Sequence, residues 1–320
     1  VPLSNVAWSV GKLYERKYAV DWGKCTNANS LNIEMCNSVG KVPDDVYKQT
    51  VELTKYYMKK YGKGKMAAII ITVILVAAII GVSSWLIAVT AKSGKYNLIK
   101  VKKSGVPNAV SGDPEEYDVE VNGINMHYAV MGKGSPLILI HGNGGSHEEL
   151  MGLMRYFAND YRVYAPDSRN QGKSGTSDEL SYKLMASDYK AFIDALNIEK
   201  PLVIGHSDGG IIAIQMSMDY PSLLKGFVAF GANSRPAGMR SYFTTWAKRK
   251  YKKTNDPLYR IMIEEPDFSE EQLNKITTPA YIVAGEFDIV KLEDTVYLHE
   301  NIKSSKIAIL KWADHSTCRT

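Results

Sequence analysis

The sequence predicts an α/β protein whose mostly parallel sheet is covered by helices on both faces. From Tyr117 onward, short apolar runs alternate with stretches of helical spacing. Glycine-rich turns and polar residues follow several of the apolar runs directly. Strands that alternate with helices favour parallel pairing, because each helix returns the chain to the starting edge of the sheet. We therefore expect one such domain over residues 117–320.

The elements of this domain can be justified in chain order. Residues 117–121 and 124–130 alternate around Asn122-Gly123, which predicts a β-hairpin. Continuous apolar runs predict buried strands at 136–140, 161–165, 201–204, 226–230, 280–284 and 307–310. Helical spacing predicts helices at 148–158, 182–196, 211–218 and 293–301. The basic stretch 235–276 has neither pattern, and we expect it to be irregular.

The central motif is Gly205-His206-Ser207-Asp208-Gly209, which lies between an apolar run and a helix of small and apolar residues. A strand, a sharp turn and a helix in this order expose the serine hydroxyl, and the glycines let strand and helix approach closely. A serine hydroxyl is a weak nucleophile until a base accepts its proton. The motif therefore predicts a nucleophile at Ser207 with a base and an acid elsewhere; an ordinary glycine-rich loop is the alternative.

The candidate base is His315, which follows the last predicted strand, because an imidazole can accept and return a proton near neutral pH. The candidate acid is Asp288, just beyond the strand at 280–284, with Glu286 as its neighbouring alternative. Reacting groups on parallel sheets lie beyond the carboxyl ends of the strands. A solvent-exposed loop residue is the alternative for each of these positions.

An oxyanion hole needs backbone N–H groups that point at a developing negative charge. We expect these donors to be the backbone amides of Asp208 and Asn143, the latter in the glycine-rich turn at 141–145. A plain tight turn is the alternative for Asn143. We expect no metal site and no cofactor in this domain.

Residues 117–320 resemble the α/β-hydrolase superfamily. The motifs that carry the resemblance occur in the family's order: His141-Gly142-Asn143-Gly144-Gly145, Asp167-Ser168-Arg169-Asn170-Gln171-Gly172, the motif around Ser207, Gly285-Glu286-Phe287-Asp288 and Ala313-Asp314-His315-Ser316. The resemblance implies a serine hydrolase that cleaves an ester or similar acyl bond of a small substrate. It also implies a short lid at about 235–276. The family usually has one more helix after the histidine, whereas the given sequence ends five residues after His315, so we expect that helix to be missing.

The motifs do not select among esterases, lipases, lactonases and carbon–carbon bond hydrolases. Aromatic residues in the lid stretch, among them Phe243 and Trp246, are consistent with an acyl pocket or with simple packing on the sheet.

The run from 66 to 91 contains no charged residue. As a helix its 26 residues would be about 39 Å long, more than the roughly 30 Å of a bilayer's hydrocarbon core. We expect a single transmembrane helix here, with a buried core helix as the alternative, and a polar linker at 92–116. Lysines flank both ends of the run, so their numbers hardly determine its orientation; we expect the hydrolase domain on the extracytoplasmic side of the lipid bilayer.

Within residues 1–65, the pattern of apolar residues predicts a strand that carries Glu34, followed by a helix at 44–61. Val1-Pro2-Leu3-Ser4-Asn5-Val6-Ala7-Trp8 and Asn29-Ser30-Leu31-Asn32-Ile33-Glu34-Met35-Cys36 resemble the middle of a zinc-dependent N-acetylmuramoyl-L-alanine amidase domain. The resemblance implies that Glu34 would be the general base on a zinc-bound water and that peptidoglycan would be a partner. Residues 1–65 contain no histidine, so we expect the segment to lack zinc and to be inactive. A surface module with a coincidental strand is the alternative.

Charge excludes one class of partner. Residues 1–65 contain 11 Lys or Arg and 6 Asp or Glu, which accounts for the whole net charge of +5. The remaining chain is neutral overall, so we expect no nucleic-acid binding. Two further interpretations stay open beside the hydrolase: a non-catalytic scaffold that binds the cell wall, and a chain that joins pieces of two neighbouring proteins.

Overall fold

The structure is a computed structural model of the 320-residue chain, and it describes residues 36–37, 40–41, 98–100 and 109–317. The chain divides into two compact units, Val1–Lys92 and Ser93–Thr320. In the first unit, β1 (Cys36–Asn37) and β2 (Gly40–Lys41) pair antiparallel. Glu34, the predicted helix at 44–61 and the predicted transmembrane run at 66–91 lie outside the described residues. Over the residues that are described, no helix is long and apolar enough to cross a membrane.

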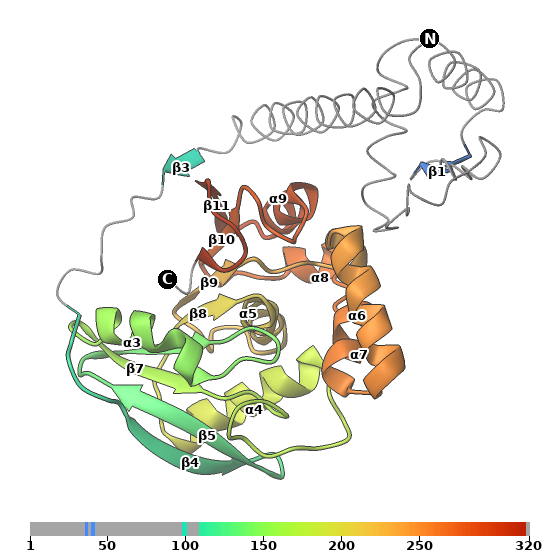
Figure 1. The fold of residues 1–320 in the computed structure, drawn as a ribbon. Helices are drawn as coiled ribbons and strands as arrows, with labels where there is room; N and C mark the ends of the chain where they lie inside the picture. Colours follow the sequence, from blue (N-terminus) through green and yellow to red (C-terminus); the bar gives the residue numbers. More distant parts are fainter. Residues whose placement is uncertain (1–35, 38–39, 42–97, 101–108, 318–320) are drawn as a thin grey trace, which may run out of the picture. The chain divides into compact units, whose positions relative to one another are not determined.

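The second unit contains, in its described part, a nine-stranded sheet with the order β3-β11-β10-β9-β8-β6-β7-β5-β4 (Figure 1). Only the pairs β4–β5 and β5–β7 are antiparallel within this sheet. The strands are β3 (Leu98–Lys100), β4 (Glu115–Val121), β5 (Ile124–Met131), β6 (Ser135–Ile140), β7 (Tyr161–Pro166), β8 (Leu202–His206), β9 (Gly226–Phe230), β10 (Ala280–Gly285) and β11 (Ser305–Lys311). The predicted mostly parallel sheet is therefore confirmed.

Helices cover both faces of this sheet, as predicted. The helical elements are η3 (His147–Leu150), α3 (Met151–Phe157), α4 (Tyr182–Ala195), α5 (Asp208–Asp219), η4 (Pro236–Gly238), α6 (Ser241–Thr254), α7 (Pro257–Glu264), α8 (Glu270–Asn274) and α9 (Leu292–Asn301). Alternate residues of β6 enter two separate apolar clusters: Leu137 and Leu139 pack with α3, and Ile138 and Ile140 pack with α4 and α5. Side chains of a strand point alternately to opposite faces, so one strand supplies both layers of the core.

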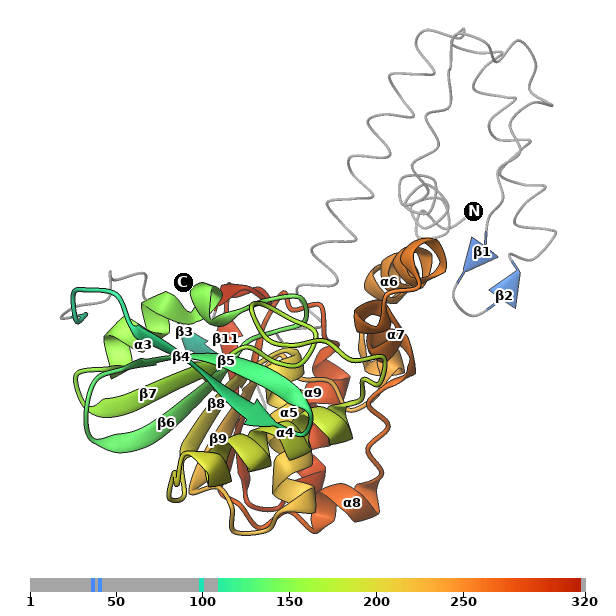
Figure 2. The same ribbon diagram turned by 90° about the horizontal axis from the view of Figure 1, so that it is seen from below.

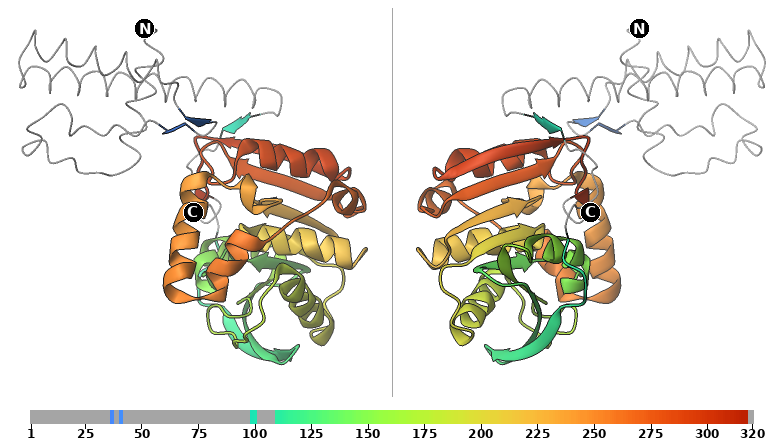
Figure 3. Two further views of the ribbon diagram at one scale, coloured as in Figure 1. Left: turned by 90° about the vertical axis from the view of Figure 1, so that its right-hand side faces the viewer. Right: turned by 90° about the vertical axis from the view of Figure 1, so that its left-hand side faces the viewer.

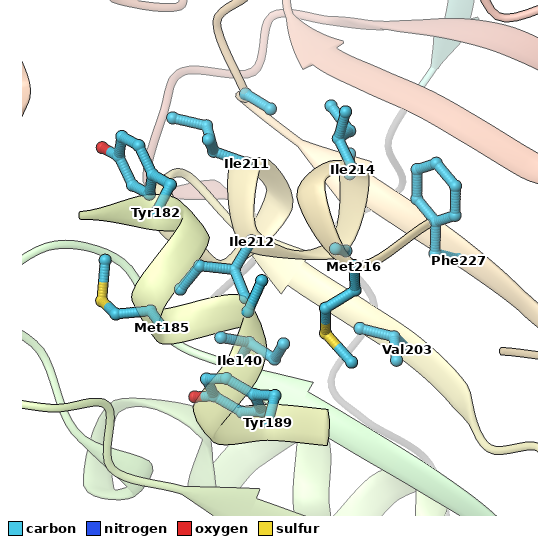
Figure 4. Packing of buried hydrophobic residues seen from close by; sticks show 14 of the residues in the cluster. Ile140, Tyr182, Met185, Tyr189, Val203, Ile211, Ile212, Ile214, Met216 and Phe227 are labelled. Carbon is cyan, nitrogen blue, oxygen red and sulfur yellow. The ribbon is translucent and has the colours of Figure 1, made fainter. Parts of the chain in front are cut away.

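The core beside α5 is built from large, fully buried side chains. Ile212 and Met216 of α5, Met185 and Tyr189 of α4 and Ile140 of β6 belong to one apolar cluster (Figure 4). Each large aliphatic or aromatic side chain buried in this way stabilises the fold by roughly 1.5–3 kcal/mol. The first turn of α5, which follows Ser207 directly, is thus anchored in the core.

The insert at 235–276 is helical, so the prediction of an irregular segment is wrong. The helices have clear start signals: Asp256 caps α7 ahead of Pro257, and Ser269 and Gln272 form a capping box at α8. α6 ends in a run of lysines on its exposed side while Ala247 is buried, and that charge concealed its helical spacing. α6 and α7 lie together to one side of the sheet, at the place of the expected lid (Figures 2 and 3).

Two further elements differ from the predicted boundaries. Within the expected linker, β3 pairs in parallel with β11, and β4 begins at Glu115. The predicted helix at 148–158 consists of a 3₁₀ turn, η3, followed by the shorter α3.

Candidate active site

Ser207 lies at a sharp turn between β8 and α5, as its motif predicts. Its backbone has φ 54° and ψ −116°, a conformation that a residue with a side chain rarely adopts. A Cβ atom at Gly205 would lie 2.1 Å from the carbonyl oxygen of Gly209, and one at Gly209 would lie 2.2 Å from that of Ile140. Both positions therefore require glycine, which is the physical reason for the motif.

Asp288 and His315 meet at the carboxyl ends of two neighbouring parallel strands, β10 and β11. Nδ1 of His315 lies 2.7 Å from Oδ1 of Asp288. The carboxylate also accepts hydrogen bonds from the backbone N–H groups of Val290 at 3.0 Å and Gly285 at 3.2 Å. Burial alone would raise the pKa of Asp288, but these hydrogen bonds and the charge of His315 outweigh it and hold the pKa below its ordinary value. A buried, ionised acceptor therefore fixes the orientation of the imidazole.

Glu286, the alternative acid, has a different partner. Its Oε2 accepts a hydrogen bond of 3.0 Å from the backbone N–H of Trp312. The geometry brings Asp288 rather than Glu286 to His315.

Ser207 and His315 both line a cavity of about 280 Å³. Aromatic side chains of the lid helices form another part of its lining, whereas the neighbouring Tyr242 is 62% exposed. The residues that line it are Gly142, Asn143, Gly144, Glu149, His206, Ser207, Phe243, Trp246, Asp256, Leu258, Tyr259, Met262, Ile289 and His315. Phe243 and Trp246, for which the sequence left two interpretations open, face this cavity.

Asn143 and Asp208, the expected oxyanion-hole residues, are joined by their side chains. Nδ2 of Asn143 donates to Oδ2 of Asp208 at 2.9 Å and to the carbonyl oxygen of Leu258 at 3.1 Å. Burial raises the pKa of Asp208, although hydrogen bonds from Asn143 and Tyr182 and the charge of His315 act in the opposite direction. The side chain of Asn143 thus connects the turn after β6 with both the start of α5 and the lid.

Two histidines contribute to the site in ways that the motifs did not indicate. His141 is 1% exposed; its Nδ1 donates to the carbonyl oxygen of Gly142 at 2.7 Å, and its Nε2 accepts from the backbone N–H of Ser168 at 2.9 Å. Burial lowers its pKa, which keeps the imidazole neutral in this arrangement. Nε2 of His206 donates to the carbonyl oxygen of His315 at 2.7 Å. Both side chains thus hold loops of the site in place by hydrogen bonds. In the sequence, only their positions could have indicated this role: His141 directly follows β6, and His206 directly precedes Ser207.

A group of possible metal ligands also lies outside this cavity lining. Glu116, His127 and His147 each offer a ligand atom, and these atoms lie within 4.8 Å of one another. The sequence led us to expect no metal site in this domain. Glu34, the expected amidase-like base, lies outside the described residues.

Comparisons with known proteins agree with this architecture. Residues 135–260 match the family described as alpha/beta hydrolase fold. The chain is 34% identical to pyrrolizixenacetamide deacetylase of Xenorhabdus hominickii over 134 residues, which cover 40% of this chain and 50% of that protein. It is 27% identical to serine hydrolase BPHL of Homo sapiens over 252 residues, which cover 68% of this chain and 86% of that protein.

Solved structures share the fold. A meta-cleavage product hydrolase from Pseudomonas fluorescens superposes with a TM-score of 0.53 at 22% identity, over 63% of this chain and 91% of that chain. Several curated relatives, the deacetylase among them, are matched over only 35% to 50% of their own length. The comparisons thus show the fold, and other matched proteins bear the names esterase, lipase and epoxide hydrolase.

Proposed function

We propose that this protein is a serine hydrolase of the α/β-hydrolase superfamily, whose model residues 135–260 match, and that it cleaves small esters or similar acyl bonds through an acyl-enzyme on Ser207. The observation that carries the proposal is the Asp288–His315 hydrogen bond beside a cavity whose lining also includes Ser207. The names of the matched esterases and of the deacetylase support the same class of substrate.

In the first half-reaction, Oγ of Ser207 attacks the substrate's carbonyl carbon while Nε2 of His315 accepts the hydroxyl proton. Asp288 holds Nδ1 of His315, which leaves the lone pair on Nε2 to accept the proton, and it stabilises the imidazolium that forms. The backbone amides of Asp208 and Asn143 are the proposed donors to the oxyanion. When the tetrahedral intermediate collapses, the carbon–oxygen bond to the alcohol breaks and His315 returns the proton to that alcohol.

In the second half-reaction, a water molecule attacks the acyl carbon and gives a proton to Nε2 of His315. The bond from Oγ of Ser207 to the acyl carbon breaks as Oγ takes that proton back. This step releases the carboxylic acid and restores the enzyme. Covalent catalysis of this type divides one difficult hydrolysis into two easier steps.

The cavity favours a small acyl group. Its volume of about 280 Å³ is near the lower end of the range of roughly 300–1,000 Å³ that is typical of small-molecule sites. Phe243, Trp246 and Tyr259 supply an apolar lining in the lid helices.

A series of p-nitrophenyl esters of increasing acyl length tests the proposal. We expect saturable hydrolysis with the highest kcat/KM for short chains, and no activity above background in Ser207→Ala. Failure to hydrolyse any ester, together with failure to react with a fluorophosphonate probe, would instead favour the non-catalytic scaffold.

We also propose that the charge-free run at 66–91 anchors the hydrolase domain to a membrane as a single-pass helix, with the domain on the extracytoplasmic side. The full chain should then remain with membranes through carbonate washing, and deletion of residues 1–91 should release it. Full-length protein that is soluble without detergent would contradict the anchor. Protease protection in sealed vesicles tests the orientation.

A single-pass helix places residues 1–65 and the hydrolase domain on opposite sides of the membrane, so contact of residues 1–65 with peptidoglycan belongs to the opposite orientation. For that orientation we propose contact without cleavage, because the segment that resembles an amidase has no histidine to hold zinc. Glu34→Gln should leave binding to purified cell walls unchanged. Release of muramoyl peptides that depends on Glu34 would overturn this proposal.

A further inference from the structure

A cluster of three side chains joins the antiparallel edge of the sheet to the segment that follows the active-site turn. Glu116 lies on β4, His127 on β5, and His147 begins η3, just after the turn at 141–145. Nε2 of His127 lies 3.1 Å from Oε2 of Glu116, and Nε2 of His147 lies 3.6 Å from Oε1 of the same carboxylate. Both Nε2 atoms therefore face one carboxylate.

Each imidazole also contacts a second carboxylate through its other ring nitrogen, Nδ1. Nδ1 of His127 lies 3.0 Å from Oδ1 of Asp118, and Nδ1 of His147 lies 3.0 Å from Oδ1 of Asp167. Metal-ligating histidines almost always donate their other ring N–H to a carboxylate, a carbonyl or a water. Here both histidines have that outer partner, and it leaves both Nε2 atoms directed at Glu116.

This arrangement creates an electrostatic requirement. A neutral imidazole that donates from Nδ1 presents a lone pair at Nε2, and this lone pair faces a negatively charged oxygen of Glu116. The two histidines are almost fully buried, 7% exposed for His127 and 2% for His147, so water screens this repulsion poorly. One divalent cation held between the three groups removes the conflict.

We propose that Glu116, His127 and His147 bind a divalent transition-metal ion of the zinc class, with an open fourth position. Two imidazoles and a carboxylate are a common zinc donor set with bond lengths of about 2.0–2.2 Å, which place neighbouring ligand atoms about 3.3–3.5 Å apart in a tetrahedron. Nε2 of His127 already lies at about this separation from Oε2 of Glu116, whereas the 3.6 Å contact of His147 is to the other oxygen, Oε1. Rotation of side chains brings the three ligand atoms, which all lie within 4.8 Å of one another, to the tetrahedral separations.

Lys173 competes with the metal for this site. Its Nζ bonds to Oε2 of Glu116, and this ion pair is exposed. Exposed ion pairs contribute little to stability, so a divalent ion can displace the ammonium group at small cost. Replacement of Lys173 by an uncharged residue should therefore strengthen metal binding.

The bound ion has a structural role in this proposal. It links the β4–β5 hairpin to η3, and the chain between β6 and η3 carries Asn143. Metal that binds only the folded protein stabilises it by mass action and raises Tm. The proposal is independent of the reaction at Ser207, because the three ligands are not part of the cavity lining there.

The test is isothermal titration of the full chain with Zn²⁺ at neutral pH, repeated with Co²⁺ to record its ligand-field absorption. We expect one site per chain with nitrogen and oxygen ligands, and a rise in Tm on addition of metal. Asp118→Asn leaves all three ligands in place and should weaken binding by about 10–100-fold, the usual effect of losing an outer carboxylate. Glu116→Gln removes a ligand and should weaken it further.

Three more variants keep the result interpretable. Lys173→Met should tighten binding, an effect that misfolding cannot imitate. His299→Asn, a histidine elsewhere in the domain, and Glu34→Gln, in the amidase-like segment, should leave binding unchanged. No saturable binding by either the natural chain or Lys173→Met would overturn the proposal, as would binding that Asp118→Asn and Glu116→Gln leave unaltered.

Discussion

Asn143 donates a hydrogen bond of 2.9 Å from Nδ2 to Oδ2 of Asp208, the residue that follows Ser207. The bond joins the turn after β6 to the first turn of α5 by their side chains. Asp208 is buried, and burial raises the pKa of its carboxyl, so each donor that it retains matters for the stability of the folded state.

Asn143→Ala should therefore lower the free energy of unfolding by about 1–3 kcal/mol, because an oxygen of a buried carboxyl loses its donor. Asn274→Ala is the matched control. The Asn274 amide bonds to the carbonyl oxygen of Glu270 on the surface, so its loss should change stability by no more than about 0.5 kcal/mol. Urea unfolding of both variants measures the difference, and equal effects would contradict the account.

Asp288→Asn should reduce kcat by about 10⁴-fold, since an amide in place of the carboxylate favours the wrong tautomer of His315. Glu286→Gln removes a carboxylate only two residues away and keeps an oxygen for the N–H of Trp312, so kcat should stay within a few-fold of the natural value. Steady-state kinetics on one p-nitrophenyl ester compares the two. If Glu286→Gln proves the more damaging change, the acid has been assigned to the wrong residue.

The lowered pKa of Asp288 makes a prediction about stability against pH. A carboxyl with a lower pKa in the folded than in the unfolded state stabilises the fold above its unfolded pKa, ordinarily 3.8, and loses this contribution as pH falls through the lower folded value. The stability advantage of the natural chain over Asp288→Asn should thus be constant above about pH 5 and shrink in acid. Unfolding measured across this range tests it, and an advantage that grows in acid would be inconsistent with the lowered pKa.

Trp246→Ala should change the preference for acyl length, because Trp246 lines the cavity from α6. Removal of this side chain enlarges the pocket, so kcat/KM should rise for longer esters relative to short ones. Tyr242→Ala is the control on the same helix, since Tyr242 is exposed and does not line the cavity. The same shift in both variants would exclude Trp246 as a determinant of chain length.

Much of the candidate site was predictable because its geometry depends on strand ends. Buried parallel strands are recognisable from their continuous apolar runs, and their carboxyl ends meet at one edge of the sheet. This rule was sufficient to place Asp288 and His315 together before any distance was known. Glycine at positions 205 and 209 followed from the close approach of strand and helix, which the separations of 2.1 Å and 2.2 Å explain.

The helices of the lid and the proposed metal cluster were not predictable in the same way. The lysines of α6 dominate its composition and concealed an amphipathic helix. The cluster needs the register of β4 and β5, in which Asp118 faces His127, as well as the position of His147 after another strand. The Asn122-Gly123 turn would have indicated the register, but the approach of η3 to the hairpin is a tertiary contact that no local pattern encodes.

The most direct test of the account is the covalent adduct itself. The full chain should be treated with a fluorophosphonate probe. Its intact mass is then measured, and the modified residue is located by peptide mass spectrometry. We predict one adduct per chain, located on Ser207, with labelling lost in Ser207→Ala and strongly slowed in Asp288→Asn. Undiminished labelling of Ser207→Ala, or an adduct on another residue of the natural chain, would contradict the central claim that Ser207 is the nucleophile.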